Sequence, residues 1–266
     1  MKKTNISALL LAALLLIQLL CAPVSAVTAE PAADAQADAQ TASDNSAGDA
    51  AAEADSVPED QLLSSREQFS VAAKAALLID LNTNRVVYEQ DADERVYPAS
   101  LTKIMTCLIA LENGNLSDVV TVSESALADL DEDSSVAGLV VGEQMTLENL
   151  LYCMMVVSGN DACNVIAEHV AGSVTDFVRM MNQRAYELGC TNTHFNNPHG
   201  LHDESHYTTA RDLAIITQAA LKSENFRQIV DTYEYKLPDD NMRQNIPKLK
   251  TTNMLIYQSM SNSLYY

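Results

Sequence analysis

Residues 98–114 read PASLTKIMTCLIALENG, and this stretch decides the fold of the chain. Its apolar residues recur every three or four positions, which is the spacing of one face of an α-helix. Pro98 precedes the pattern and Gly114 follows it, as is common at the two ends of a helix. The sequence therefore predicts a core helix that begins near Ser100. Its apolar face consists of Leu101, Ile104, Met105, Leu108 and Leu111.

Ser100 and Lys103 are three positions apart at the start of this helix, so we expect their side chains to meet on one side, facing away from the apolar stripe. A serine hydroxyl is a poor nucleophile until a base takes its proton, and a lysine serves as that base only when neutral. Burial favours the neutral amine by lowering its pKa from about 10.4. The helix N-terminus adds partial positive charge where an oxyanion would form. A Ser-x-x-Lys pair also arises by chance as a capped helix with a solvated lysine.

A second polar element follows 58 residues later in the chain, at Ser158-Gly159-Asn160. A helical pattern that opens on Thr146 breaks there, and another helix is predicted from Asp161 to Gly172. Such a Ser-x-Asn turn presents a hydroxyl and an amide into a cleft. Taken alone, it would be interpreted as a helix cap.

Outward from these elements, residues 73–80 and 85–89 form two short apolar runs around a polar turn, which predicts a β-hairpin. Ser173 is expected to cap an amphipathic helix that runs to Gly189. Residues 191–207 are rich in turn formers, and Thr208 is expected to open another helix. The predicted organisation is a hairpin followed by a block of helices.

The first 26 residues are typical of a secretory signal peptide, with Lys2 and Lys3, an apolar run to Leu20, and cleavage expected after Ala26. A retained signal anchor is less favoured, because the apolar run is shorter than the roughly 20 residues of a membrane span. Cys21 suggests a lipoprotein, but the residue before it is bulky. We therefore expect an exported protein of the cell envelope.

Residues 27–66 are rich in alanine and acidic residues, and they predict a disordered acidic tether because they bury too little apolar surface to fold. Residues 67–266 then make one domain. The formal net charge of -20 argues against nucleic acid and anionic lipid as direct partners. With 8 Gly and 0 Trp, neither a nucleotide-binding loop nor an aromatic carbohydrate platform is indicated.

Four cysteines follow the signal segment: Cys107, Cys153, Cys163 and Cys190. Three of them fall within apolar helical patterns, so small buried thiols are the favoured interpretation. Export also permits disulfides, and the sequence leaves that alternative open.

Ser-x-x-Lys and Ser-x-Asn, in this order and behind a signal peptide, resemble the motifs of penicillin-binding serine acyltransferases. The best resemblance is to the D-alanyl-D-alanine carboxypeptidases of peptidase family S11, the low-molecular-weight penicillin-binding proteins, and it extends from about Ala73 to Tyr266. It implies an α/β (α+β) β-lactamase/transpeptidase-like fold, with an antiparallel sheet flanked by helices. It also implies that Ser100 forms the acyl-enzyme, Lys103 acts as general base, Ser158 relays protons and Asn160 binds the substrate amide.

The same resemblance implies cleavage of peptidoglycan stem peptides that end in D-Ala-D-Ala, with β-lactams as covalent inhibitors. It implies neither a metal ion nor an organic cofactor. His199, within Asn197-Pro198-His199-Gly200, resembles a family loop landmark, not a catalytic base.

The sequence departs from the family pattern at the third motif, because no Lys-Thr-Gly triplet occurs in it. Lys250-Thr251-Thr252 is a weak substitute, since threonine would obstruct a substrate backbone where glycine admits it. The resemblance places the missing motif on a strand after Tyr266. We therefore expect the C-terminal strands and any C-terminal membrane anchor to be missing, and the chain to be inactive or unstable, with membrane contact through the signal segment alone.

Three other functions stay open. A zinc peptidase would use the cluster of histidines and acids in the turn-rich segment, namely His194, His199, His202, His206, Asp203 and Glu204. A non-catalytic envelope-binding protein would keep the helical half of the fold without the third motif. A class A β-lactamase shares the first two motifs, but residues 208–212 fit the carboxypeptidases better.

Overall fold

The computed structural model of the chain describes residues 71–128, 130, 134–253 and 256. The predicted signal peptide (1–26) and tether (27–66) lie outside the described residues. Within the described residues, no helix is both long and apolar enough to cross a membrane.

The predicted hairpin is present. Strands β1 (Ala76–Asp80) and β2 (Arg85–Gln90) pair antiparallel, with a register shift between Leu78 and Ile79. The turn between them contains Asn84 at φ 56°, a left-handed conformation that asparagine tolerates better than most residues. One face of the hairpin buries Leu77 and Ile79 against α8 (Ala210–Ala220).

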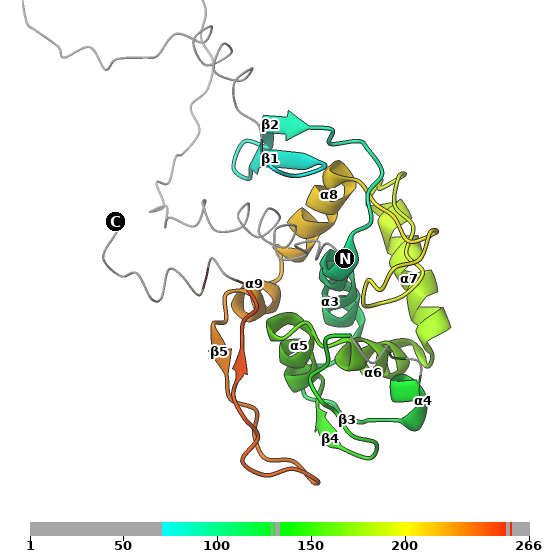
Figure 1. The fold of residues 1–266 in the computed structure, drawn as a ribbon, viewed down its shortest axis with the longest axis vertical. Helices are drawn as coiled ribbons and strands as arrows, with labels where there is room; N and C mark the ends of the chain where they lie inside the picture. The colour runs from blue at the N-terminus through cyan, green and yellow to red at the C-terminus, as the bar shows by residue number, and fades with distance from the viewer. Residues whose placement is uncertain (1–70, 129, 131–133, 254–255, 257–266) are drawn as a thin grey trace, which may run out of the picture. The chain divides into compact units, whose positions relative to one another are not determined.

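Helix α3 (Thr102–Asn113) is the centre of the helical block (Figure 1). It packs against α5 (Leu147–Val156), α6 (Asn160–Ala171), α7 (Val174–Glu187), α8 and α9 (Glu224–Val230). Residues 102–110 are all buried, so this part of the helix is covered on every side. The predicted apolar face packs in the core, and the polar face is covered as well, by the segments that form the site.

Side-chain caps fix where these helices begin. Thr146, Ser173 and Ser223 each accept a hydrogen bond from a backbone N–H of the following helix. The cap of α8 is Thr209, not Thr208 as the sequence suggested, because the Thr209 side chain accepts from Asp212 N. Thr208 instead pairs with Val96 in an isolated bridge.

Several short elements had no clear sequence signal. Strands β3 (Val119–Thr121) and β4 (Gln144–Thr146) pair antiparallel, as do β5 (Glu234–Tyr235) and β6 (Leu249–Lys250). Helix α4 (Glu124–Ala128) follows β3. A one-turn 3-10 helix, η1 (Ala99–Leu101), leads into α3 and carries Ser100.

The described strands form three separate two-stranded sheets, so β1 and β2 represent the flanked sheet expected from the sequence. Cys107, Cys153, Cys163 and Cys190 are all free and buried, as the thiol interpretation predicted.

Candidate active site

The structure brings Ser100 and Lys103 together at the junction of η1 and α3. The side-chain nitrogen of Lys103 lies 3.4 Å from Ser100 Oγ. Pro98 and the left-handed Ala99 (φ 50°) turn the chain into η1, so Ser100 sits on a tight and strained entry to the helix. The i, i+3 geometry predicted from the sequence is therefore present.

Lys103 is enclosed, with only 3% of its surface exposed. Its Nζ also donates to Asn160 Oδ1 and to the carbonyl oxygen of His199, each at 2.8 Å. The three acceptors are a hydroxyl, an amide oxygen and a carbonyl oxygen, and none of them carries a formal charge. Burial consequently lowers the pKa of Lys103 from its usual value, which favours the neutral amine.

Ser158 completes this arrangement from the turn between α5 and α6. Its hydroxyl donates to Ser100 Oγ at 3.1 Å, so Ser100 has a polar neighbour on each side. Ser158 adopts φ 61°, an uncommon conformation for a residue with a side chain. Asn160 follows as the first residue of α6, and the turn therefore points both side chains toward Ser100 and Lys103.

The segment 196–201 wraps around the start of α3. The sequence interpretation did not predict its contacts with that helix. Thr106 Oγ1 donates to the carbonyl oxygen of Pro198 at 2.6 Å, one helical turn beyond Lys103. Gly200 lies so close to Ala99 that an added Cβ would be 1.8 Å from the Ala99 carbonyl oxygen. His199 thus contributes through its backbone, as a landmark residue would, and its ring accepts the N–H of Leu201.

His206 is a further site residue that sequence reasoning assigned only to a possible zinc cluster. Its Nδ1 accepts the N–H of Asn196, so Nε2 carries the proton and donates to Thr102 Oγ1 at 2.7 Å. Burial lowers the pKa of His206 to about 4, which keeps the ring neutral at pH 7. The ring therefore ties segment 196–201 to the turn that carries Ser100.

The structure does not gather the histidines into a metal centre. Among the described residues, no group of three or more His, Cys, Asp or Glu side chains is arranged to hold a metal ion. His199 and His206 are engaged in the bonds above, and His194 Nδ1 bonds to the carbonyl oxygen of Ser205. Lys250 is exposed on β6, where it lies opposite Glu234 of β5 in the strand register.

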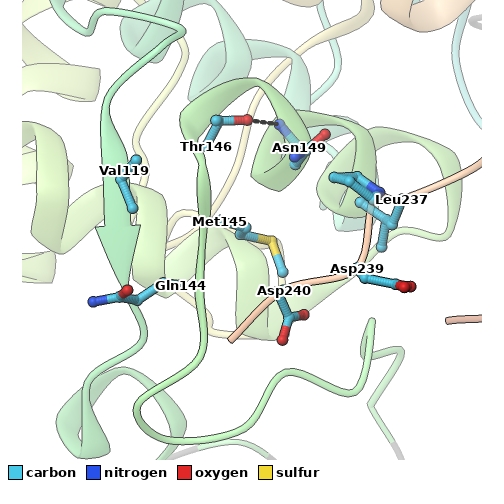
Figure 2. A pocket seen from close by; sticks show the side chains of 9 residues that line it. Val119, Gln144, Met145, Thr146, Asn149, Leu237, Asp239 and Asp240 are labelled. Atoms are coloured by element: carbon cyan, nitrogen blue, oxygen red, sulfur yellow. Dashed lines mark hydrogen bonds between the residues drawn. The ribbon is translucent and has the colours of Figure 1, made fainter. Parts of the chain in front are cut away.

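A pocket of about 190 Å³ opens elsewhere, between β3, β4 and residues 237–240. Figure 2 shows Met145, Leu237 and Asp240 among the side chains that surround it. None of the four predicted site residues lines this pocket, and its lining contains no paired nucleophile and base.

Known proteins resemble this chain over most of the described residues. A family profile described as D-alanyl-D-alanine carboxypeptidase, Peptidase S11, matches residues 62–264. The chain belongs to this family. Among related carboxypeptidases, DacF of Bacillus subtilis is 42% identical over 192 residues, covering 69% of this chain and 47% of the relative. DacC of Escherichia coli is 40% identical over 160 residues, covering 57% and 40%.

Solved structures of the same kind show the fold. The Streptomyces K15 DD-transpeptidase superposes with a TM-score of 0.66 at 32% identity, covering 71% of this chain and 77% of that one. Penicillin-binding protein 5 from Haemophilus influenzae gives 0.65 at 34% identity, covering 72% and 56%. The family S11 chain thus has the β-lactamase-like α/β fold of the DD-peptidases. It spans about half or less of the length of the curated carboxypeptidases named above.

Proposed function

We propose that the protein is a serine-type D-Ala-D-Ala carboxypeptidase that removes the terminal D-alanine from peptidoglycan stem peptides during cell-wall synthesis and remodelling. The observation that carries the proposal is the enclosed amine of Lys103, held 3.4 Å from Ser100 Oγ by uncharged acceptors. A lysine in this environment is suited to act as a neutral base. Family membership supplies the substrate class.

In the acylation step, the lone pair of neutral Lys103 takes the proton of Ser100 Oγ, and two N–H groups stay on Asn160 Oδ1 and the His199 carbonyl. The serine oxygen forms a bond to the carbonyl carbon of the penultimate D-alanine. The bond to the terminal D-alanine then breaks, and its nitrogen needs a proton. Ser158, 3.1 Å from Ser100 Oγ, is placed to pass that proton from Lys103 to the leaving amine.

Deacylation reverses these roles. Water attacks the ester on Ser100, Lys103 accepts its proton, and Ser100 leaves with a proton restored from the lysine. Asn160 serves in both steps, because its amide oxygen orients Lys103 while its NH₂ group is available to a substrate carbonyl. The N-terminal end of the α3 segment adds partial positive charge beside the developing oxyanion.

We further infer that the protein is exported by its N-terminal segment, residues 1–26, and acts in the cell envelope. The apolar run and small-residue cleavage pattern support this placement. β-Lactams are expected to acylate Ser100 in the same way as the peptide substrate.

A second candidate function is a non-catalytic envelope-binding protein. The observation in its favour is that the sequence holds no Lys-Thr-Gly triplet, the third motif of these acyltransferases. Losing a single oxyanion donor typically lowers the rate about 10²- to 10³-fold, so the third motif matters to the enzyme proposal.

Labelling with a fluorescent penicillin separates the two functions. The enzyme proposal expects covalent label on the purified chain, mapped to the peptide containing Ser100 and absent from Ser100→Ala. The binding proposal expects no label, together with equal retention of the chain and of Ser100→Ala on purified peptidoglycan. Folded protein that shows neither label nor retention would contradict both.

A further inference from the structure

Asp161 is a buried carboxylate beside the Ser158–Asn160 turn, and it is fully engaged with backbone amides. Only 2% of the residue is exposed. One oxygen accepts the N–H groups of Ala137 and Ala162, each at 2.9 Å. The other accepts those of Gly138 and Leu139, at 2.9 and 3.0 Å. Three consecutive amides of a remote segment are thus bound by a single side chain.

A reciprocal bond ties the same segment to the neighbouring residue of the turn. The N–H of Asn160 donates to the carbonyl oxygen of Ser135 at 2.8 Å. Gly159 is also close to the segment, because an added Cβ there would lie 3.1 Å from Ala137 N. Residues 135–139 are therefore fastened along the turn that presents Ser158 and Asn160 to the nucleophile.

Asp161 also supplies charge near the base. Burial lowers the pKa of Lys103, and negative charge at Cys163 or Asp161 acts in the opposite direction. Burial raises the pKa of Cys163 to about 12, so this thiol is uncharged at neutral pH. The other of these two groups is the carboxylate of Asp161.

The other titratable groups around Lys103 are also neutral. Cys107 lies on the same helix, and burial raises its pKa well above the usual range. His199 faces Lys103 from segment 196–201. Burial, aided by the charge of Lys103, lowers the pKa of His199 to about 4. The environment of the base therefore consists of neutral groups and one carboxylate.

We propose that Asp161 is a positioning residue with two effects: it fastens residues 135–139 to the Ser158–Asn160 turn, and it places a carboxylate directly after Asn160, the residue whose amide oxygen binds the Lys103 amine. The inference rests on the proposed function in naming Lys103 as the base. It adds a residue that touches neither nucleophile nor substrate, yet holds the segment that packs on the Ser158–Asn160 turn and acts on the charge state of the base.

Asp161→Asn tests both effects. Each carboxylate oxygen accepts two N–H groups, so the amide of asparagine would place a donor against two donors. The substitution also removes the charge. Asp212→Asn is a matched control, because Asp212 is another buried aspartate in the first turn of a helix, and it accepts Asn192 N at 2.9 Å. Asp212 is not among the groups whose charge acts on Lys103.

Two measurements on the full chain read these effects without requiring catalysis. Amide hydrogen exchange at residues 137–139 should be about tenfold faster or more in Asp161→Asn, because the acceptor of these amides is lost. The ¹³Cε resonance of Lys103, assigned by its absence in Lys103→Met, should titrate with a lower midpoint than in the wild type. Asp212→Asn should leave both readings as in the wild type.

Asp161→Glu separates the two effects and covers the case in which Asp161→Asn does not fold. Its charge is retained, so the Lys103 midpoint should stay near that of the wild type, whereas the longer side chain should still expose the three amides. If the titration midpoint of Lys103 is the same in Asp161→Asn as in Asp212→Asn, the proposed charge effect is overturned. Unchanged exchange at residues 137–139 in either Asp161 variant would overturn the proposed anchor.

Penicillin labelling of the wild type runs in parallel. Its failure would contradict the proposed enzyme while leaving the titration and exchange results to judge Asp161. Where label forms, the acid limb of the acylation rate should move to lower pH in Asp161→Asn, and a limb that does not move would overturn the inference.

Discussion

The amine of Lys103 donates to the backbone carbonyl of His199 at 2.8 Å, across 96 positions of sequence. A carbonyl is present whatever residue occupies the position, so the path of the backbone, not the imidazole, makes this contact. The placement of the base thus depends on how segment 196–201 lies against α3.

Gly200 is the residue on which that path depends most directly. Gly200→Ala should destabilise the chain by more than about 3 kcal/mol or displace Ser100, because the new Cβ would collide with the Ala99 carbonyl. Gly172 provides a matched control: its φ is also positive, at 81°, but nothing lies within 4 Å of an added Cβ. Gly172→Ala should cost about 1–2 kcal/mol. Urea denaturation measures both, and equal losses would argue against the close packing.

Replacing the base should remove acylation without removing the fold. Lys103→Met is expected to lower the rate of penicillin acylation by at least about 10²-fold, since Ser100 loses its proton acceptor. Lys74→Met is the control, because Lys74 is exposed and pairs with Glu94. Stopped-flow acylation and circular dichroism check rate and fold. A Lys103→Met variant as fast as Lys74→Met would show that another group activates the serine.

Ser158 should matter for proton transfer more than for stability. Ser158→Ala removes the hydroxyl that donates to Ser100 at 3.1 Å, and we expect acylation to slow by about 10²- to 10⁴-fold. The melting temperature should change little, because the turn backbone is held by other contacts. Ser117→Ala, at an exposed serine, is the comparison. A similar rate in both variants would remove Ser158 from the relay.

His206 should make stability depend on pH. Its folded pKa of about 4 lies below the ordinary value near 6.5, so the unfolded chain binds the proton more readily. The free energy of unfolding should therefore fall as pH drops from about 6.5 to 4, and level off below. The maximum slope from one such histidine is about 1.4 kcal/mol per pH unit. His206→Gln should flatten this slope.

A chelator should leave penicillin labelling unchanged. The proposed chemistry uses Ser100, Lys103, Ser158 and Asn160, and no step requires a metal ion. Incubation with EDTA before labelling makes the measurement, with a zinc peptidase assayed beside it as a positive control. If EDTA abolished labelling and added zinc restored it, the result would favour a metal site at the histidine cluster.

The sequence predicted the parts of the site that depend on local periodicity. Ser100 and Lys103 could be placed together because i, i+3 spacing is fixed by helix geometry, whereas Ser158 and Asn160 were added by the family resemblance at a predicted helix break. The hairpin and the caps at Thr146 and Ser173 followed from local pattern. The roles of these four residues stay predictions until the labelling experiments are done.

What the sequence did not predict depends on contacts between distant segments. The His199 carbonyl, the Asp161 anchor and the bond from His206 to Thr102 join segments that are far apart in sequence, and periodicity does not indicate which distant segment a residue contacts. Strands of two or three residues, such as β3 and β5, are held by their partners and not by propensity. The polar side of α3 is likewise covered by segments that are distant from it in sequence.

Ala99 and Ser158 both adopt left-handed conformations and flank the nucleophile on separate segments, and such conformations cost about 1–3 kcal/mol each. Glycine would relieve that cost at either position, so selection for heat resistance alone would favour Ala99→Gly and Ser158→Gly. The first would loosen the backbone that aims Ser100, and the second would delete a hydroxyl that contacts it. Thermal stability and reactivity are thus opposed at these two positions. A laboratory evolution experiment that screens only for melting temperature would be expected to select a more stable protein in which Ser100 is acylated more slowly.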